Sequence, residues 1–313
     1  MQTRLKVYRY DPESAQQEGR YQDYTVDLPE YGTVLEALLD IRDHQDGTLS
    51  LRCSCRSAIC GSCSMKINGQ SRLACKTLVA NLTHEGDTIT VAPMGNQPVI
   101  KDLVVDMTMF WDKVQAVQPY LRPEGPLPER EYLVSNESMI QLTTAMNCIM
   151  CGACVSDCTV LEVDKSFLGP AALAKAYRFA ADPRDGHKNE RLRLYTQPSG
   201  IWDCTRCFMC VQACPKGVAP MERIMELRAM AMEAGLTDTR GARHVDSFAR
   251  SVKHSGRLDE FGLARGTYGF LTWPFVLAPL GIRRFFRRRL PPIIHKGITT
   301  AKNVTRLFQR FGA

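Results

Sequence analysis

The chain has 313 residues, of which 44% are hydrophobic and 23% charged, and its formal net charge is +7. This length accommodates two domains and a tail, and the composition is that of a folded protein rather than a disordered or fibrous one. The first ten residues are polar and basic, and no run of about 18 apolar residues occurs, so we expect neither an export signal nor a membrane span.

Residues 1–105 are predicted to form a small α+β domain. Alternation of apolar and polar residues indicates strands over 3–10, 21–28, 64–68 and 88–92. Thr33 is followed three residues later by Glu36, which is the capping-box pattern of a helix start. We therefore expect a small sheet crossed by one helix, with a cysteine-rich loop between the helix and the third strand.

This loop carries the first candidate site. Cys55, Cys60 and Cys63 follow the C-x4-C-x2-C spacing of plant-type 2Fe-2S proteins, and Cys75 follows after eleven residues. Small residues in the loop allow the backbone to approach the inorganic sulfides. Structural zinc sites favour C-x2-C pairs, so the spacing favours a 2Fe-2S cluster over zinc.

Residues 106–235 are predicted to form a second, nearly all-helical domain, and 236–313 a separate basic extension. Helical patterns occupy 107–117, 170–180 and 221–234, the last of which is ended by Gly235. A proline-rich connector occupies 119–128.

Two copies of one cysteine pattern lie in the helical domain. Both read C-x2-C-x2-C-x3-C, the run of bacterial ferredoxins with two clusters, in which the fourth cysteine binds the other cluster. We predict a first 4Fe-4S cluster on Cys148, Cys151, Cys154 and Cys214. A second is predicted on Cys158, Cys204, Cys207 and Cys210.

The three sets use twelve of the thirteen cysteines and leave Cys53, which we interpret as an unliganded small hydrophobe. The odd number, the tight grouping and the expected lack of an export signal argue against a disulfide framework. Two zinc sites remain the alternative to the two cubanes. The six histidines lie outside all three groups and are not predicted as ligands.

The C-terminal extension carries the positive charge of the chain. Ten basic residues and no acidic residue follow Glu260, so the first 260 residues carry a net charge of −3. Residues 269–282 are apolar but short and broken by two prolines, and RRFFRRR follows directly. Such a segment fits an interfacial anchor on anionic lipid or docking to a membrane subunit. The other interpretation is a solvated basic tail that packs on a partner protein.

The order of a plant-type two-iron domain and a helical domain with two ferredoxin runs resembles the iron–sulfur subunits of succinate dehydrogenase and fumarate reductase. The resemblance covers about residues 1–235 and is carried by CRSAICGSCSMKINGQSRLAC, PVIKDLVVDM, FLGPAALAKAYRFAADPRD and GIWDCTRCFMCVQACPKGVAP. It implies an α+β chain: a β-grasp plant-type ferredoxin domain, an all-α bacterial-ferredoxin-like domain and a basic tail.

The resemblance also implies a function within a complex. A FAD-containing flavoprotein partner would oxidise succinate or reduce fumarate, and this chain would pass single electrons between it and a quinone near a membrane-anchor subunit. The 2Fe-2S cluster would lie nearest the flavin, the Cys214-containing cubane in the middle and the third cluster at the exit. No catalytic residue and no nucleic-acid partner are expected in this chain. The implied location is peripheral, on the cytoplasmic face of a prokaryotic inner membrane.

Three positions depart from the common pattern of that family. The common third cluster is 3Fe-4S because the position of Cys207 is not a cysteine; here Cys207 predicts 4Fe-4S, with 3Fe-4S as the alternative. Such a cubane would have a lower potential, which suits a low-potential quinone or fumarate reduction. The common family has a quinone-site tryptophan shortly after the position of Cys158, but residues 159–163 contain none. It also has a histidine after the position of Cys204, where this chain has Thr205. These two differences point to an acceptor site on a partner subunit. Thr159 also replaces the proline that ordinarily follows Cys158.

Two other functions remain open from the sequence. An iron–sulfur subunit of heterodisulfide reductase or glycolate oxidase type also carries paired ferredoxin runs, although the plant-type domain and PVIKDLVVDM speak against it. A zinc-stabilised interaction module is the third interpretation, and iron and sulfide analysis distinguishes it from the other two.

Overall fold

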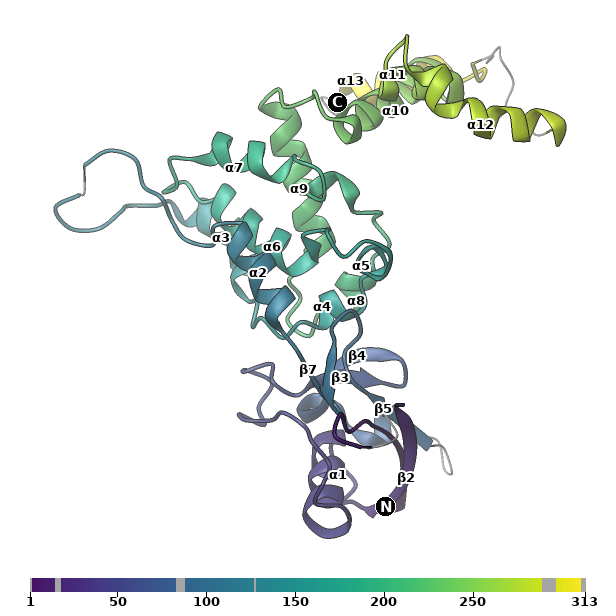
Figure 1. The fold of residues 1–313 in the computed structure, drawn as a ribbon. Helices are drawn as coiled ribbons and strands as arrows, with labels where there is room; N and C mark the ends of the chain where they lie inside the picture. Colours follow the sequence, from purple (N-terminus) through teal and green to yellow (C-terminus); the bar gives the residue numbers. More distant parts are fainter. Residues whose placement is uncertain (1, 15–17, 83–87, 127, 289–296, 311–313) are drawn as a thin grey trace. The chain divides into compact units, whose positions relative to one another are not determined.

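The computed structural model describes residues 2–14, 18–82, 88–126, 128–288 and 297–310. The chain divides into two compact units, Met1–Ala229 and Met230–Ala313. The first unit contains the sheet, the cysteine groups and most of the helices, and the second contains the helices of the C-terminal extension (Figure 1).

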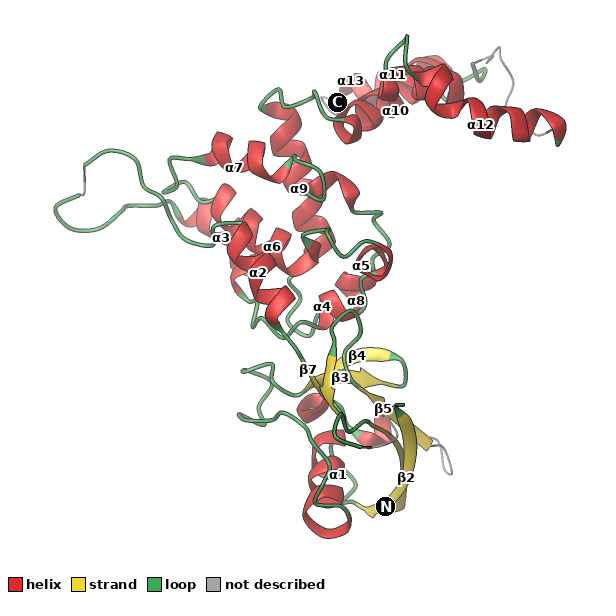
Figure 2. Cartoon of the chain, in the orientation of Figure 1, coloured by secondary structure: helices red, strands yellow, loops and turns green. Residues whose placement is uncertain are grey.

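A five-stranded mixed sheet forms the N-terminal part of the first unit (Figure 2). Its strands are β1 (Gln2–Arg9), β2 (Arg20–Asp27), β3 (Ser64–Ile67), β4 (Gln70–Leu73) and β5 (Thr88–Ala92), in the spatial order β2–β1–β5–β3–β4. β1 and β5 pair in parallel, whereas β1–β2, β3–β4 and β3–β5 are antiparallel. The predicted α+β architecture is thereby confirmed, with β4 as a strand that the sequence did not predict.

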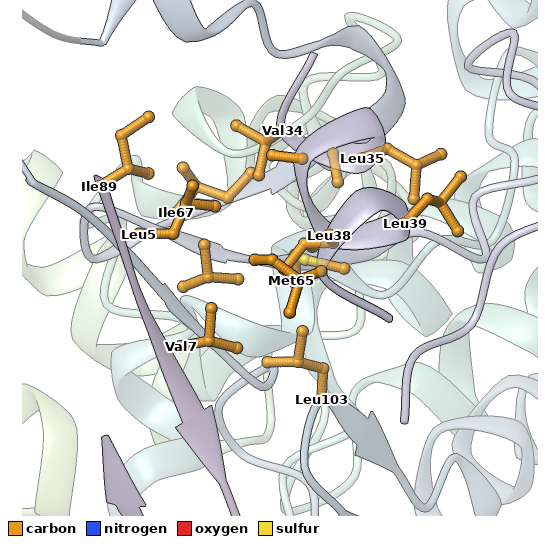
Figure 3. Packing of buried hydrophobic residues seen from close by; sticks show 14 of the residues in the cluster. Leu5, Val7, Val34, Leu35, Leu38, Leu39, Met65, Ile67, Ile89 and Leu103 are labelled. Atoms are coloured by element: carbon orange, nitrogen blue, oxygen red, sulfur yellow. The ribbon is translucent and has the colours of Figure 1, made fainter. Parts of the chain in front are cut away.

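One helix packs its apolar face on this sheet. α1 (Val34–Asp40) begins at the predicted capping box: the Glu36 N–H donates to Thr33 Oγ1 at 3.2 Å, and the Thr33 N–H donates to the Glu36 carboxylate at 2.7 Å. A π-helical turn, Ile41–Gln45, continues the helix. Side chains from α1 and the strands form one buried cluster, which Figure 3 shows around Leu5, Val7, Val34, Leu38, Met65, Ile67 and Ile89. Removal of this apolar surface from water stabilises the domain.

A short hairpin ties the sheet to the loop that follows α1. The hairpin consists of β6 (Val99–Lys101) and β7 (Val104–Val105). Between them, the buried carboxylate of Asp102 accepts from Arg9 Nε at 3.0 Å and from the Ser50 N–H at 2.8 Å. Arg9 also pairs with Asp46. These bonds hold the residues just before the first cysteine group against the end of β1.

The remainder of the first unit is helical. Its helices are α2 (Thr108–Ala116), α3 (Asn136–Met146), α4 (Ala153–Ser156), α5 (Thr159–Val163), α6 (Gly169–Ala180), α7 (Lys188–Tyr195), α8 (Met209–Gln212) and α9 (Pro220–Glu233), the last of which continues past Ala229 into the second unit. Single 3-10 turns occur at Ala74–Lys76, Val79–Asn81 and Ile201–Asp203. The predicted helical patterns correspond to α2, α6 and α9, and Pro170 lies in the first turn of α6 as expected.

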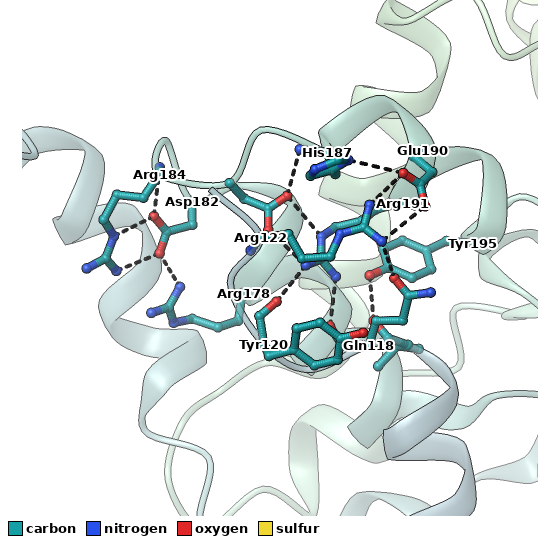
Figure 4. A network of polar contacts seen from close by, with 12 residues as sticks. Gln118, Tyr120, Arg122, Arg178, Asp182, Arg184, His187, Glu190, Arg191 and Tyr195 are labelled. Carbon is teal, nitrogen blue, oxygen red and sulfur yellow. Dashed lines mark hydrogen bonds and ion pairs between the residues drawn. The ribbon is translucent and has the colours of Figure 1, made fainter. Parts of the chain in front are cut away.

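A buried ionic network fixes the segment after α2 onto α7 (Figure 4). Arg191 and Asp185 are both fully buried and pair at 2.8 Å. The remaining Arg191 donors reach the Gln118 carbonyl at 2.7 Å and the Tyr120 carbonyl at 2.6 Å. Because every charge here has partners, the network positions α7 and the connector without an uncompensated buried ion.

The second unit is a group of four helices within its described residues. They are α10 (Arg240–Ser255), α11 (Glu260–Tyr268), α12 (Trp273–Phe286) and α13 (Ala301–Arg310), and α10 packs against α11 and α13. The expectation that two prolines break the apolar segment was wrong. Pro274 lies in the first turn of α12, where its missing N–H costs nothing, and α12 continues through Pro279. Within the described residues, no helix is both long and apolar enough to cross a bilayer.

Candidate metal centres

The first cysteine set lies in a loop whose backbone N–H groups point at sulfur. Cys55 Sγ accepts from the N–H groups of Ser57 at 3.4 Å, Ile59 at 3.3 Å and Cys60 at 3.3 Å. Left-handed residues within the loop create this concave array of donors; they are Arg56, Ala58 and Gly61, with φ of 53°, 55° and 75°. Convergent donors of this kind stabilise the negative charge of cluster sulfur.

The other members of the first set lie close by. The Ala58 N–H donates to Cys75 Sγ at 3.3 Å. Burial raises the pKa of Cys63 to about 12, and the neighbouring Cys75 and Cys60 contribute. In contrast, the hydroxyl of Ser62 and backbone N–H groups lower the pKa of Cys60 to about 6. The loop therefore combines one buried thiol with an exposed thiol that ionises easily.

The second set consists of cysteines from both ferredoxin runs. Cys148, Cys151, Cys154 and Cys214 line one pocket, whose other walls are largely apolar. Burial raises the pKa of Cys151 to about 11, with further contributions from Cys148 and Cys214, and raises that of Cys154 well above its usual value. The Val218 N–H donates to Cys214 Sγ at 3.3 Å. The fold thus brings the fourth cysteine of the second run to the first three of the first run.

The third set is the reciprocal one. Burial raises the pKa of Cys210 to about 12, and Cys204, Cys158 and Cys207 lie near enough to add to this shift. Cys207 is exposed. Partial burial would raise the pKa of Cys207, but hydrogen bonds to its sulfur have the larger effect and lower the pKa. The largest of these contributions comes from the Thr159 hydroxyl, which donates to Cys207 Sγ at 3.4 Å.

The two runs share one backbone conformation. The residue before the second cysteine is left-handed in both, with φ of 56° at Met150 and 60° at Arg206. The residue after it is also left-handed, at Gly152 and Phe208, and begins the short helices α4 and α8. Cys207 therefore occupies in its run the place that Cys151 occupies in the other.

Direct packing places the first set beside the second. A Cβ atom added to Gly61 would lie 2.7 Å from Cys151 Cβ. Hydrogen bonds support this contact: Ser71 Oγ donates to Asp157 Oδ1 at 2.7 Å, and Asn96 Nδ2 donates to the Val155 and Cys158 carbonyls at 2.9 and 3.0 Å. The second and third sets are brought together by the packing of α4, which carries Cys154, against α8, which carries Cys210.

Arg228 is a residue of the third site that the sequence analysis missed. Its side chain is buried in α9 and donates to the carbonyls of Ile201 at 2.8 Å, Trp202 at 3.0 Å and Cys204 at 2.8 Å. Burial lowers the pKa of this guanidinium, whereas the nearby Cys204 thiol acts in the opposite direction and raises it. The available signal was periodicity, because Arg228 lies four residues after Ile224 and three before Ala231, both on the buried face of this helix.

The residues present fit iron–sulfur clusters. Within the described residues, no three His, Cys, Asp or Glu side chains converge at the spacing of a single metal ion. The pocket between Cys148, Cys151, Cys154 and Cys214 is instead a space that the four thiols surround. Cysteine-only donor sets with N–H groups directed at sulfur suit iron–sulfur clusters. Cys53 is partly buried and packs against the N-terminal core, which agrees with its interpretation as an unliganded small hydrophobe.

Comparison with known proteins extends these observations. Residues 4–112 match a family model described as a 2Fe-2S iron-sulfur cluster binding domain, and residues 144–218 one described as a 4Fe-4S dicluster domain. The succinate dehydrogenase iron-sulfur subunit of Paracoccus denitrificans is 37% identical over 232 residues, which cover 74% of this chain and 88% of the relative. The fumarate reductase iron-sulfur subunit of Mycobacterium tuberculosis is 40% identical over 229 residues, or 72% of this chain and 92% of the relative.

A solved structure agrees with these relatives. A chain of the Mycobacterium smegmatis Sdh1 complex in the apo form superimposes with a TM-score of 0.69 at 25% identity, covering 76% of this chain and 98% of that one. About a quarter of the present chain lies outside each of these alignments.

Proposed function

Because the chain belongs to the family of iron–sulfur subunits of succinate dehydrogenase and fumarate reductase, we propose that it relays electrons between a FAD-containing flavoprotein and a quinone at the membrane. The observation that carries this proposal is the order of the thiol sets in the fold. Gly61 of the first loop contacts Cys151 of the second set, and α4, which carries Cys154 of the second set, packs against α8, which carries Cys210 of the third. The family assignment also favours this function over that of a heterodisulfide reductase or glycolate oxidase subunit.

The residues of this chain would bind the clusters and shield part of their surroundings from water. An iron–sulfur cluster, when bound, accepts and releases one electron at a time. The N–H groups directed at Cys55 stabilise negative charge at the first site, and burial shields the thiols of Cys154 and Cys210 from water at the other two. Oxidation of succinate to fumarate releases two electrons and two protons, and that chemistry belongs to the flavoprotein in this proposal.

The ligand sets are proposed as the sequence predicts them. The 2Fe-2S cluster is assigned to Cys55, Cys60, Cys63 and Cys75, and the middle 4Fe-4S cluster to Cys148, Cys151, Cys154 and Cys214. For the third cluster, on Cys158, Cys204, Cys207 and Cys210, the repeated backbone conformation around Cys207 and Cys151 supports 4Fe-4S over 3Fe-4S.

A quinone or anchor subunit is proposed to approach the third site. Thr159, at the position of the usual proline, uses its hydroxyl to bind Cys207. Apolar side chains nearby remain open: Val163 is 91% exposed and Phe208 50%. This surface suits an acceptor site completed by a membrane subunit, which would place the chain peripherally on the cytoplasmic face of a prokaryotic inner membrane.

Purification of the native complex tests the proposal. We expect about ten iron atoms per chain, from one two-iron and two four-iron clusters, together with succinate:quinone or quinol:fumarate activity. Replacement Cys207→Ser should convert the third cluster to a three-iron form, with its oxidised-state EPR signal and the loss of one iron atom. A three-iron signal already present in the wild-type complex would contradict the 4Fe-4S assignment. Zinc in place of iron would contradict the relay itself.

A further inference from the structure

Helix α12 exposes apolar side chains over most of its surface, and only the face of Trp273, Leu277 and Gly281 is half-buried. Residues 273–282 carry no charged side chain, and no residue of α12 is buried within the described part of the chain. Phe275 is 83% exposed and Phe286 80%. A helix that is hydrophobic all round is normally buried, so α12 has the surface of an element with an external partner.

The arginines near its C-terminus give α12 two different sides. Phe275, Ile282 and Phe286 are separated by seven and four residues, which places them on one face of a helix. Arg283 and Arg284 project away from this face by the same spacing, Arg287 caps the C-terminus of the helix, and all three are exposed. An aromatic face opposite a cluster of arginines is the arrangement of helices that lie in a membrane surface.

The length and composition of α12 exclude a spanning position. Its 14 residues extend about 21 Å, whereas the hydrocarbon core of a bilayer is about 30 Å thick. Pro279 has no N–H to donate to the Phe275 carbonyl, and water at the interface satisfies such a group better than lipid tails do. Both features suit a helix parallel to the surface.

We propose that α12 binds an anionic phospholipid surface, with Phe275, Ile282 and Phe286 at the acyl boundary and Arg283, Arg284 and Arg287 at the phosphates. Charge complementarity favours this partner, because no acidic residue follows Glu260. This binding is independent of the electron relay, so either proposal can fail without the other.

Vesicle flotation of the full-length, cluster-loaded chain tests the proposal. The chain should bind vesicles made of phosphatidylglycerol and phosphatidylcholine in equal parts, be released by salt, and bind pure phosphatidylcholine vesicles far less. The triple replacement Arg283→Gln, Arg284→Gln, Arg287→Gln should lower the partition coefficient on the order of 100-fold. The triple replacement Phe275→Ser, Ile282→Ser, Phe286→Ser should also remove most binding. Wild-type iron and sulfide contents would show that the first unit of each variant is intact.

A matched control removes the same charge elsewhere in the tail. Lys302, Arg306 and Arg310 are exposed on α13, and their replacement by Gln should leave most of the binding. Equal loss in the two charge variants would overturn the proposal, because general basicity would then suffice. Failure of the wild-type chain to bind anionic vesicles, with α12-dependent binding to a membrane subunit in detergent, would overturn it in favour of a protein partner.

Discussion

Gly61 lies against Cys151, so closely that an added Cβ on Gly61 would come within 2.7 Å of Cys151 Cβ and 2.9 Å of Cys151 Cα. The two loops that carry the first and second cysteine sets therefore touch through backbone and Cβ atoms, with no side chain between them. Electron transfer weakens steeply with distance, and this contact keeps the step between the two sites short.

Gly61→Ala is expected to force these loops apart. The φ of 75° at Gly61 disfavours alanine by about 1–2 kcal/mol, and overlap with Cys151 adds about 1–3 kcal/mol. The midpoint of urea-induced loss of cluster absorbance should fall accordingly, and EPR should show weaker magnetic coupling between the first two clusters.

Gly69→Ala is the matched control for this substitution. Gly69 has nearly the same φ, 78°, but nothing lies within 4 Å of its would-be Cβ. Only the backbone cost of about 1–2 kcal/mol should appear there, with the coupling unchanged. Equal effects of the two substitutions would show that the Gly61–Cys151 contact is not tight in solution.

Arg228→Met is expected to lower the reduction potential of the third cluster. The buried guanidinium lies at the carbonyl of Cys204 and favours the more negative, reduced cluster. Its removal should shift the potential downward on the order of 50 mV, about 1 kcal/mol for one electron. An EPR-monitored redox titration measures this shift, and Arg228→Lys should restore part of it.

Arg223→Met serves as the control on the same helix. The Arg223 guanidinium already pairs with Glu226 at 3.1 Å and Glu222 at 3.4 Å, so its charge is largely compensated. We expect no change in the potential of the third cluster. If the reduction potential of the third cluster were unchanged in Arg228→Met, the role of Arg228 would be limited to holding the loop that leads to Cys204.

Asp185→Ala is expected to destabilise the helical domain strongly. It would leave the fully buried Arg191 without its carboxylate, at a cost of about 3–5 kcal/mol. Glu190→Ala removes a 61%-exposed partner of Arg122 and should cost at most about 1 kcal/mol. Urea unfolding followed by circular dichroism compares the two, and similar losses would contradict the burial of the Arg191–Asp185 pair.

Asp182 is expected to make stability depend on pH in the acid range. Burial would raise the pKa of Asp182, but hydrogen bonds from Arg184 and Arg178 outweigh it and lower the pKa to about 2. Because the folded pKa lies below the unfolded value, Asp182 contributes about 2 kcal/mol above roughly pH 5 and loses it as the pH falls from about 4 to 2. The difference in unfolding midpoint between wild type and Asp182→Asn should therefore shrink over that interval. A constant difference would contradict the lowered pKa.

The parts of the fold that the sequence predicts are those encoded by neighbouring residues. The Thr33–Glu36 capping box is a contact within one turn, and it appears as expected. β4 was not predicted because Gln70–Leu73 contains a single apolar residue, Leu73, and so shows no alternation of apolar and polar residues. α10 was missed although Val245, Phe248 and Val252 recur at helical spacing, and the prolines of α12 obscured a helix that tolerates both.

The candidate sites likewise combine features encoded by neighbouring residues with contacts between residues far apart in the sequence. Cysteine spacing within each run is local, which is why the runs identify the 2Fe-2S and 4Fe-4S domains that the family models also match. Arg228 and Asn96 act on backbone carbonyls 24 to 62 residues away in the sequence, and no motif encodes such partners. Only the folded chain reveals which side chains surround the third site and join the domains.

The proposed exchange of cysteines between the two runs would have a consequence for biosynthesis. The Cys148 set is complete only after Cys214 has been synthesised, and the Cys158 set only after Cys210 has been synthesised. A nascent chain that has emerged only as far as residue 203 therefore possesses neither quartet of thiols in full, although the first loop is already complete. With the proposed ligand sets, both cubanes of the helical domain would therefore assemble only after residues 204–214 have been synthesised.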